Sequence, residues 1–223
     1  MLFSGQKGTL AVFGIAVASL GSQAAADFVN PMIPVWRSAA NADFYGWEIF
    51  TSAFGGPNLP NYSGTESGAA LFNFGFGTSI DSGGNMYAGS GPLSLTVLAG
   101  ASDQIVEVIV NVATIGTFIN DNSAVLRLSN NLGGGLNVVP SAVEIRSNES
   151  APNSQGQIQT RAYKFIVPPT GSILPRFELN LGSVSNNITL DALSIDIRYV
   201  PAPGAIALLA IAGTLAVGRR RQG

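Results

Sequence analysis

The chain has 223 residues, with no cysteine and no histidine, and only 11% of its residues are charged. Without these two residue types it has no disulfide framework, no Ser–His–Asp triad, no thiolate nucleophile and none of the usual zinc ligands. Between residues 27 and 199, seven lysines and arginines stand against 13 acidic residues, a net charge of −6; this argues against nucleic acid as a partner, because phosphate binding needs clustered basic side chains.

The N-terminal segment, residues 1–26, is typical of a secretory signal peptide. A polar start with Lys7 precedes an apolar run from Thr9 to Leu20. The small residues Ala24 and Ala26 fit the rule for signal-peptide cleavage. We therefore expect the mature chain to begin after Ala26. A short buried N-terminal helix is the alternative.

Residues 27–199 are expected to form one all-β domain. In the run 188–200, apolar and polar residues alternate, so one strand face carries Leu193, Ile195, Ile197 and Tyr199. Similar alternation predicts further strands at 70–77, 93–99, 105–113, 124–130, 142–148, 158–167 and 176–183. No segment shows a sustained helical period, although residues 42–54 could hold a short turn. About eight to ten strands with one polar face indicate an antiparallel β-sandwich, for which we expect the jelly-roll form.

Five acidic residues in these strands are the candidates for a carboxylate pair that hydrolyses glycosidic bonds. They are Glu107, Glu144, Glu178, Asp191 and Asp196. Strand alternation places them outward, where a solvated surface carboxylate is the simpler interpretation. We therefore expect no enzymatic activity, and a matrix glycoside hydrolase is the less favoured alternative.

Two loops carry oxygen ligands of the kind that Ca²⁺ prefers. These are Asp81–Asn85, with the sequence DSGGN, and Asn120–Asn122, with the sequence NDN. Ordinary turns use the same residue types, because aspartate and asparagine side chains bond to their own backbone. We expect no cofactor, and a structural calcium ion is the alternative.

Six aromatic residues gather between Trp36 and Phe54, and both tryptophans of the chain are among them. Flat aromatic rings can cover the apolar C–H face of a sugar while neighbouring polar groups bond to its hydroxyls. Trp36, Tyr45 and Trp47 are therefore candidate glycan contacts. The favoured alternative is that the two tryptophans fill the core of the sandwich.

The C-terminal segment, residues 200–223, has three parts in a fixed order. An apolar run, 205–217, follows a proline-rich motif and precedes a block of arginines. The motif is Val200, Pro201, Ala202, Pro203 and Gly204, and the block is Arg219, Arg220 and Arg221. With the flanking Gly204 and Gly218, the run as a helix would be about 22 Å long, shorter than the roughly 30 Å hydrocarbon core of a bilayer. The arginines favour the cytoplasmic side, so transient attachment to the membrane is favoured over a permanent span.

This tail resembles the PEP-CTERM sorting signals of exosortase substrates, in a V-P-x-P-G-A variant where Ala202 replaces the name-giving glutamate. The resemblance implies a Gram-negative-type envelope, export across the inner membrane, and processing near the motif by an exosortase-type enzyme. It also implies residence at the cell surface, in the outer envelope or in the exopolysaccharide matrix.

The middle domain resembles jelly-roll carbohydrate-binding and galactose-binding-like modules in its strand pattern and its aromatic cluster. Together with the tail, this resemblance favours an exported structural or adhesive protein. A carbohydrate-binding module for matrix exopolysaccharide is the alternative.

Overall fold

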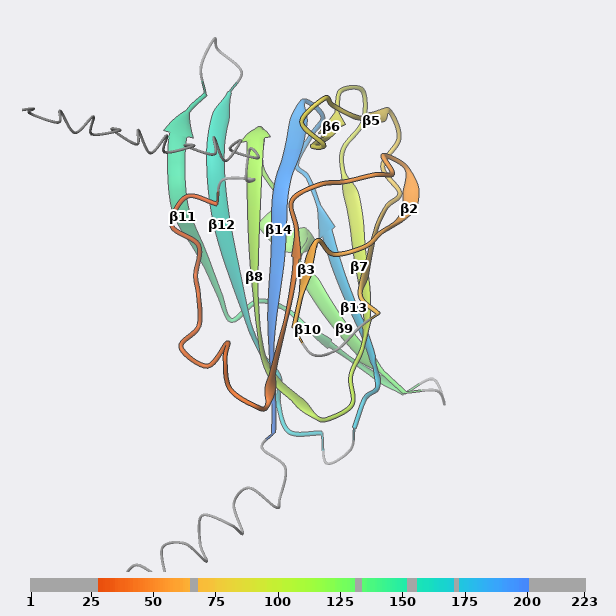
Figure 1. Cartoon of the computed structure of the whole chain (residues 1–223), viewed down its shortest axis with the longest axis vertical. Coiled ribbons are helices and arrows are strands. Elements are labelled where there is room, and N and C mark those ends of the chain that lie inside the picture. The colour runs from red at the N-terminus through yellow and green to blue at the C-terminus, as the bar shows by residue number, and fades with distance from the viewer. Residues whose placement is uncertain (1–27, 65–67, 131–133, 152–155, 171–172, 201–223) are drawn as a thin grey trace, which may run out of the picture.

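A computed structural model describes residues 28–64, 68–130, 134–151, 156–170 and 173–200, which form two packed antiparallel β-sheets (Figure 1). The antiparallel β-sandwich expected from the sequence is therefore confirmed. The expected signal helix and the C-terminal hydrophobic helix lie outside the described residues.

One sheet, sheet A, contains β1 (Ala42–Trp47), β3 (Tyr62–Ser63), β5 (Thr78–Ile80), β6 (Met86–Ala88), β8 (Ile105–Gly116), β11 (Ala142–Ser150), β12 (Gln157–Ile166) and β14 (Ile188–Tyr199). The other, sheet B, contains β2 (Gly55–Asn58), β4 (Ala70–Asn73), β7 (Ser94–Gly100), β9 (Val125–Ser129), β10 (Gly135–Val138) and β13 (Arg176–Gly182). A short 3₁₀ turn, η1 (Asp121–Ser123), precedes β9. Sheet A has the order β11-β12-β8-β14-β1-β3, with β6 also paired to β14 and β5 to β6; sheet B has the order β10-β9-β13-β7-β4-β2.

The core lies between the two sheets and follows the predicted alternation. In β14, Leu193, Ile195 and Ile197 are completely buried, and in β13 the alternate apolar residues are at most 2% exposed. Burying one such side chain contributes roughly 1.5–3 kcal/mol, so the alternating strands supply the main driving force for packing. Each predicted strand overlaps an observed one.

The sequence pattern predicts no strand within residues 42–54, but Ala42–Trp47 form strand β1. This strand pairs with β14 from Ala42 opposite Arg198 to Trp47 opposite Leu193. The alternation is hidden because one inward residue is the acid Asp43, which is 2% exposed. The Tyr45 hydroxyl donates a hydrogen bond of 2.9 Å to the Asp43 carboxylate, which makes burial of this polar group tolerable.

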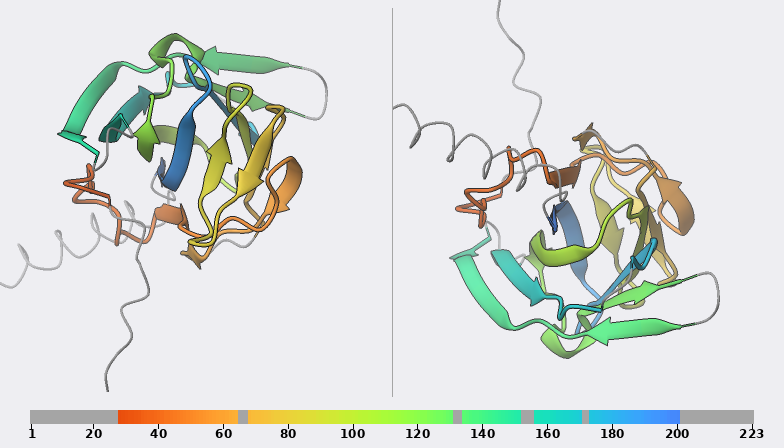
Figure 2. Two further views of the ribbon diagram at one scale, coloured as in Figure 1. Left: turned by 90° about the horizontal axis from the view of Figure 1, so that it is seen from above. Right: turned by 90° about the horizontal axis from the view of Figure 1, so that it is seen from below.

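Residues 28–41, which we call the strap, lie against the outer face of sheet A (Figure 2). The Met32 backbone exchanges two hydrogen bonds with the Asn111 carboxamide, of 2.7 and 3.1 Å. The Val29 N–H donates to Thr160 Oγ1 at 3.1 Å. Polar side chains on the outward face of β8 and β12 therefore hold a covering segment rather than bulk water.

The strap also makes apolar and charged contacts with sheet A. Phe28 packs against the buried pair Ala113 and Ala192. Arg37 forms a two-pronged ion pair with Asp196, in which Nη2 lies 2.8 Å from Oδ2 and Nε bonds to Oδ1. A bidentate pair of this kind fixes orientation as well as contributing energy. The strap is thus anchored across β8, β12 and β14.

Candidate functional site

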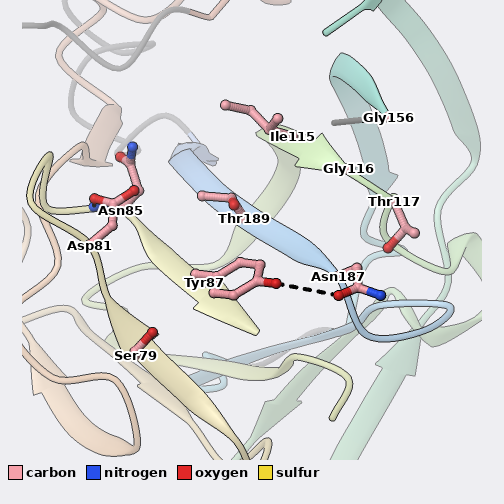
Figure 3. Close-up of a pocket in the computed structure, with 10 residues that line it drawn as sticks. All are labelled: Ser79, Asp81, Asn85, Tyr87, Ile115, Gly116, Thr117, Gly156, Asn187 and Thr189. Carbon is pink, nitrogen blue, oxygen red and sulfur yellow. Dashed lines mark hydrogen bonds between the residues drawn. The ribbon is translucent and has the colours of Figure 1, made fainter. Parts of the chain in front are cut away.

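An open cleft of about 710 Å³ lies on the outer face of sheet A. We call it the Tyr87 cleft. Its walls come from β5, β6, the end of β8 and the start of β14 (Figure 3). The lining residues are Ser79, Asp81, Asn85, Tyr87, Ile115, Gly116, Thr117, Gly156, Asn187 and Thr189.

The cleft is the part of the sheet face directly beyond the strap. Phe28, the first described residue, covers Ala113 and Ala192, which pair with each other across β8 and β14. The cleft residues Ile115 and Thr189 are the next outward pair along the same two strands. Among the described residues, the strap therefore covers one part of this face and leaves the adjoining part uncovered.

The β5–β6 hairpin positions one wall of the cleft through the turn Asp81–Asn85. Asp81 Oδ1 accepts hydrogen bonds from the backbone N–H groups of Gly83 and Asn85, at 2.8 and 2.9 Å. Gly84 has a φ of +88°, a value that glycine adopts without strain. The loop oxygen considered as a calcium ligand is thus used to close a turn.

Tyr87 projects from the middle of β6 into the cleft. Its neighbours in the strand, Met86 and Ala88, are fully buried, whereas Tyr87 is 39% exposed, so its ring lies on the outward face. Its hydroxyl bonds to Asn187 Oδ1 at 3.3 Å. A Cβ added at Gly89 would lie 2.9 Å from the ring, so the absence of a side chain there leaves room for this rotamer.

Asn187 holds its own place through its backbone. Its φ of +57° lies in the left-handed region, which asparagine tolerates better than most residues. Its N–H donates to the Ala88 carbonyl at 2.7 Å, which ties the start of β14 to the end of β6. The result is a rigid polar amide at the edge of the tyrosine ring.

The expected glycan contacts Tyr45 and Trp47 need correction, because they are 1% and 0% exposed. Trp47 lies in the core, where its Nε1–H donates to the Asn58 carbonyl at 2.9 Å. Trp36 lies in the strap and is partly buried, with the Arg198 guanidinium 5.5 Å from its ring centre. The alternative that the tryptophans fill the core therefore holds for Trp47 and not for Trp36.

Two of the five candidate carboxylates are buried rather than solvated. Asp196 is 0% exposed and Glu107 is 4% exposed, because the strap and neighbouring basic side chains cover the outer face of sheet A. Glu107 forms ion pairs with Lys164 at 3.0 Å and Arg198 at 2.6 Å. Burial raises the pKa of Asp196, and Arg37 opposes this shift by stabilising the charged form. Both acids are therefore engaged in structural ion pairs.

The remaining candidate carboxylates are dispersed. Glu144 lies on β11 and forms an ion pair with Arg146 at 2.8 Å. Glu178 lies on β13 in the other sheet and accepts a hydrogen bond from Asn180 at 2.9 Å, while Asp191 lies at a bulge in β14. None of these five acids is among the residues that line the Tyr87 cleft.

The second loop considered for calcium is occupied by side chains of the protein itself. The Asp121 carboxylate accepts hydrogen bonds from Arg161 Nη1 at 2.5 and 2.6 Å and from the Tyr163 hydroxyl at 2.9 Å. Burial and the nearby carboxylate raise the pKa of Tyr163. Asn120 Oδ1 accepts a bond from the Asn122 N–H. In the described part of the chain, no three acidic side chains gather into a metal-binding group.

The segments next to β2 and β4 of sheet B present a different aromatic surface, which we call the phenylalanine face. Phe54, Phe74 and Phe76 are 54%, 52% and 76% exposed. The rings of Phe54 and Phe76 stack with centres 5.4 Å apart. The alternation of phenylalanine with asparagine and glycine in residues 70–77 was the sequence signal for this surface.

Sequence reasoning missed the Tyr87 cleft. The strands that carry Ser79 and Tyr87 are only three residues long, too short for a period-two pattern to be read. The one available signal was the turn sequence DSGGN between them. The partners on β8 and β14 lie some 30 to 110 residues further along the chain, so only the folded sheet brings them together.

Several predicted site residues lie outside the described residues. These are Ala24 and Ala26 of the cleavage site, Pro201, Ala202, Pro203 and Gly204 of the sorting motif, and Arg219, Arg220 and Arg221. Val200, the first residue of the motif, is the last described residue, and its N–H donates to the Gln104 carbonyl at 2.8 Å. Within the described segments, no helix combines the length and the apolar character needed to cross a membrane.

Comparison with protein-family models and with curated proteins finds no match to this chain.

Proposed function

We propose that this chain is an exported, non-catalytic protein of the cell surface or exopolysaccharide matrix, and that its β-sandwich binds a matrix glycan in the Tyr87 cleft. The observation that carries the binding proposal is the exposed Tyr87 ring in an open cleft lined mainly by hydroxyl and carboxamide groups. The export proposal is supported by residues 1–26 and by the three-part tail, 200–223.

The chemistry of the cleft matches the two-sided character of a sugar. A pyranose has an apolar C–H face, which can stack on the Tyr87 ring, and hydroxyls around its rim. Asn85, Asn187 and Thr189 surround the ring with groups that both donate and accept hydrogen bonds. The volume of about 710 Å³ is within the usual range of roughly 300–1,000 Å³ for sites that hold small ligands.

The same lining supports binding rather than hydrolysis. Glycoside hydrolysis by the usual mechanism needs two carboxyl groups about 5–10 Å apart. Asp81 is the one carboxylate among the ten lining residues, and its Oδ1 already accepts two backbone N–H groups. A lone, hydrogen-bonded carboxylate is suited to ligand contact.

The binding proposal predicts that Tyr87→Ala weakens affinity for glycans extracted from the matrix by at least about tenfold, or roughly 1.4 kcal/mol. The reason is loss of the only aromatic surface among the lining residues. Isothermal titration calorimetry of the mature protein measures this change. Since Tyr87 is partly exposed, the free energy of unfolding should change by less than about 0.5 kcal/mol.

Phe76→Ser is the matched control, because it removes a ring that is 76% exposed in the loop between β4 and β5 and is not among the residues that line the cleft. Its affinity for glycan should equal that of the unmodified protein. If Phe76→Ser loses binding and Tyr87→Ala retains it, the site lies on the phenylalanine face. If no matrix glycan produces heat with the unmodified protein, the binding proposal fails. The structural or adhesive role then remains as the proposed function.

The export proposal predicts two processed ends. Mass spectrometry of the protein from the cell surface or medium should find an N-terminus at Asp27 and a C-terminus near Pro203. Glutamine replacement of the basic block should impair retention at the membrane and processing by an exosortase-type enzyme; the residues replaced are Arg219, Arg220 and Arg221. An extracellular form that still ends at Gly223, or normal processing of the glutamine variant, would contradict the sorting proposal.

A further inference from the structure

We infer that the Tyr87 cleft selects glycans that carry free amino groups and discriminates against glycans rich in uronate. This inference rests on the proposed glycan-binding function and adds the charge class of the ligand. It is carried by the placement of one carboxylate in the cleft and of every cation of the domain elsewhere.

The cleft contains a single charged side chain. Asp81 is exposed, and no lysine or arginine is among the ten lining residues. An anionic sugar would therefore meet a like charge with no compensating cation. A ligand ammonium group would instead gain a charge-assisted hydrogen bond, which is stronger than one between neutral groups.

The lysines and arginines of the domain lie outside the cleft. Five of the seven lysines and arginines between residues 27 and 199 form ion pairs with acids outside the cleft: Arg37, Arg146, Arg161, Lys164 and Arg198. The other two, Arg127 and Arg176, lie on β9 and β13 of the opposite sheet. A small rearrangement of the cleft would thus not supply a cation.

The orientation of the carboxylate is fixed by the turn that carries it. Asp81 Oδ1 accepts the N–H groups of Gly83 and Asn85, and neither bond uses Oδ2. Figure 3 places Asp81 and Asn85 at one end of the cleft and Asn187 at the other, with the Tyr87 ring between them. A sugar stacked on that ring would present its ring substituents toward Asp81 at one side and Asn187 at the other.

The long-range electrostatic field of the domain also favours cationic over anionic ligands. The domain carries a net charge of −6, which repels polyanions and attracts polycations at low ionic strength. This effect decays over about 8 Å at physiological salt. Local contact with Asp81 and the general field can therefore be separated by salt and by the position of a charge-neutralising substitution.

The test uses three oligosaccharides of equal length: glucosamine, N-acetylglucosamine and galacturonate oligomers. The mature protein is titrated with each at about pH 5, where sugar amines are protonated and carboxylates are ionised. We expect the glucosamine oligomer to bind about three- to fivefold more tightly than its acetylated counterpart, the gain typical of an exposed ion pair. The galacturonate oligomer should bind most weakly.

Asp81→Asn isolates the local contact. A carboxamide oxygen can still accept the two backbone N–H bonds that close the turn, so the hairpin is retained while the charge is lost. Affinity for the glucosamine oligomer should fall to that for the N-acetylglucosamine oligomer, so that the preference disappears. Asp103→Asn is the matched control, since Asp103 is exposed in the loop before β8, at the opposite end of that strand from the cleft.

The outcomes separate this inference from the function on which it rests. If the galacturonate oligomer binds as tightly as the glucosamine oligomer, the charge selectivity is wrong and glycan binding still stands. If Asp81→Asn and Asp103→Asn reduce the preference equally, the general field acts and the assignment to Asp81 is wrong. If none of the oligomers and no matrix glycan binds, the proposed function and this inference both fail.

Discussion

Replacing Arg37 with methionine is expected to lower the free energy of unfolding by about 3–5 kcal/mol at neutral pH, because it leaves a buried charge without its partner. Asp196 is 0% exposed and receives both prongs of the Arg37 guanidinium. Chemical denaturation followed by tryptophan fluorescence measures the loss. The same substitution also detaches the strap from sheet A at this point.

The loss should depend on pH in a defined direction. Burial already raises the pKa of Asp196, and removing Arg37 will raise it further, above the value in the unfolded chain. A folded state that binds the proton more tightly is favoured as pH falls. The variant should therefore regain stability as pH falls from neutral through the folded-state pKa toward the unfolded-state pKa of about 4.

A double variant distinguishes the buried charge from lost packing. Arg37→Met combined with Asp196→Leu replaces the ion pair with apolar groups, an exchange that is often close to neutral in stability. It should recover most of the stability lost in Arg37→Met and should lack the acid-dependent recovery. If Arg37→Met alone costs less than about 1 kcal/mol, water reaches Asp196 and the strap is not a firm cover.

Replacing Trp47 with alanine is expected to lower the free energy of unfolding by about 3–5 kcal/mol, the usual cost of emptying a large aromatic site in a core. Trp47 is completely buried, and its indole N–H satisfies the Asn58 carbonyl. Trp47→Phe should cost less, because it keeps most of the apolar volume and loses the hydrogen bond. Thermal and chemical unfolding of the two variants measure the difference.

This prediction also separates core from binding surface. Under conditions where Trp47→Phe remains folded, its glycan affinity should match that of the unmodified protein. Tyr87→Ala should show the opposite pattern, with stability retained and affinity lost. A Trp47→Phe protein that is stable and fails to bind glycan would show that Trp47 contributes to the binding site. That result would contradict the argument from its burial.

The alternation of apolar and polar residues predicted the long strands well, because in these strands the apolar residues are the buried ones. In β13, for example, Phe177 and Leu179 face inward while Glu178 faces outward. Strand β1 escaped prediction because its inward face includes Asp43, whose polarity is compensated by Tyr45. That compensation depends on side-chain geometry, which a period-two pattern does not register.

The same reasoning failed for Asp196 and Glu107, where the outward direction was predicted correctly and the solvent exposure was wrong. Period-two alternation assigns a side chain to one face of a sheet and contains no information about a third layer. Here the strap supplies that layer, and Arg37 makes it compatible with a buried acid. An outward polar residue is solvated only if nothing else packs on that face.

By itself, the sequence determined that this protein is a cysteine-free, histidine-free, acidic antiparallel β-sandwich, because composition and local alternation suffice to specify those properties. Only the tertiary structure decided which aromatic residues are accessible and where a cleft lies. Trp47 belongs to a segment rich in aromatic residues, yet it is buried between the two sheets. Tyr87 has no aromatic neighbour nearby in the sequence, yet it is partly exposed. The physical reason is that a binding site requires side chains from distant strands to converge on an uncovered surface. Strand pairing decides which side chains converge, and the placement of the strap decides which part of the surface stays uncovered.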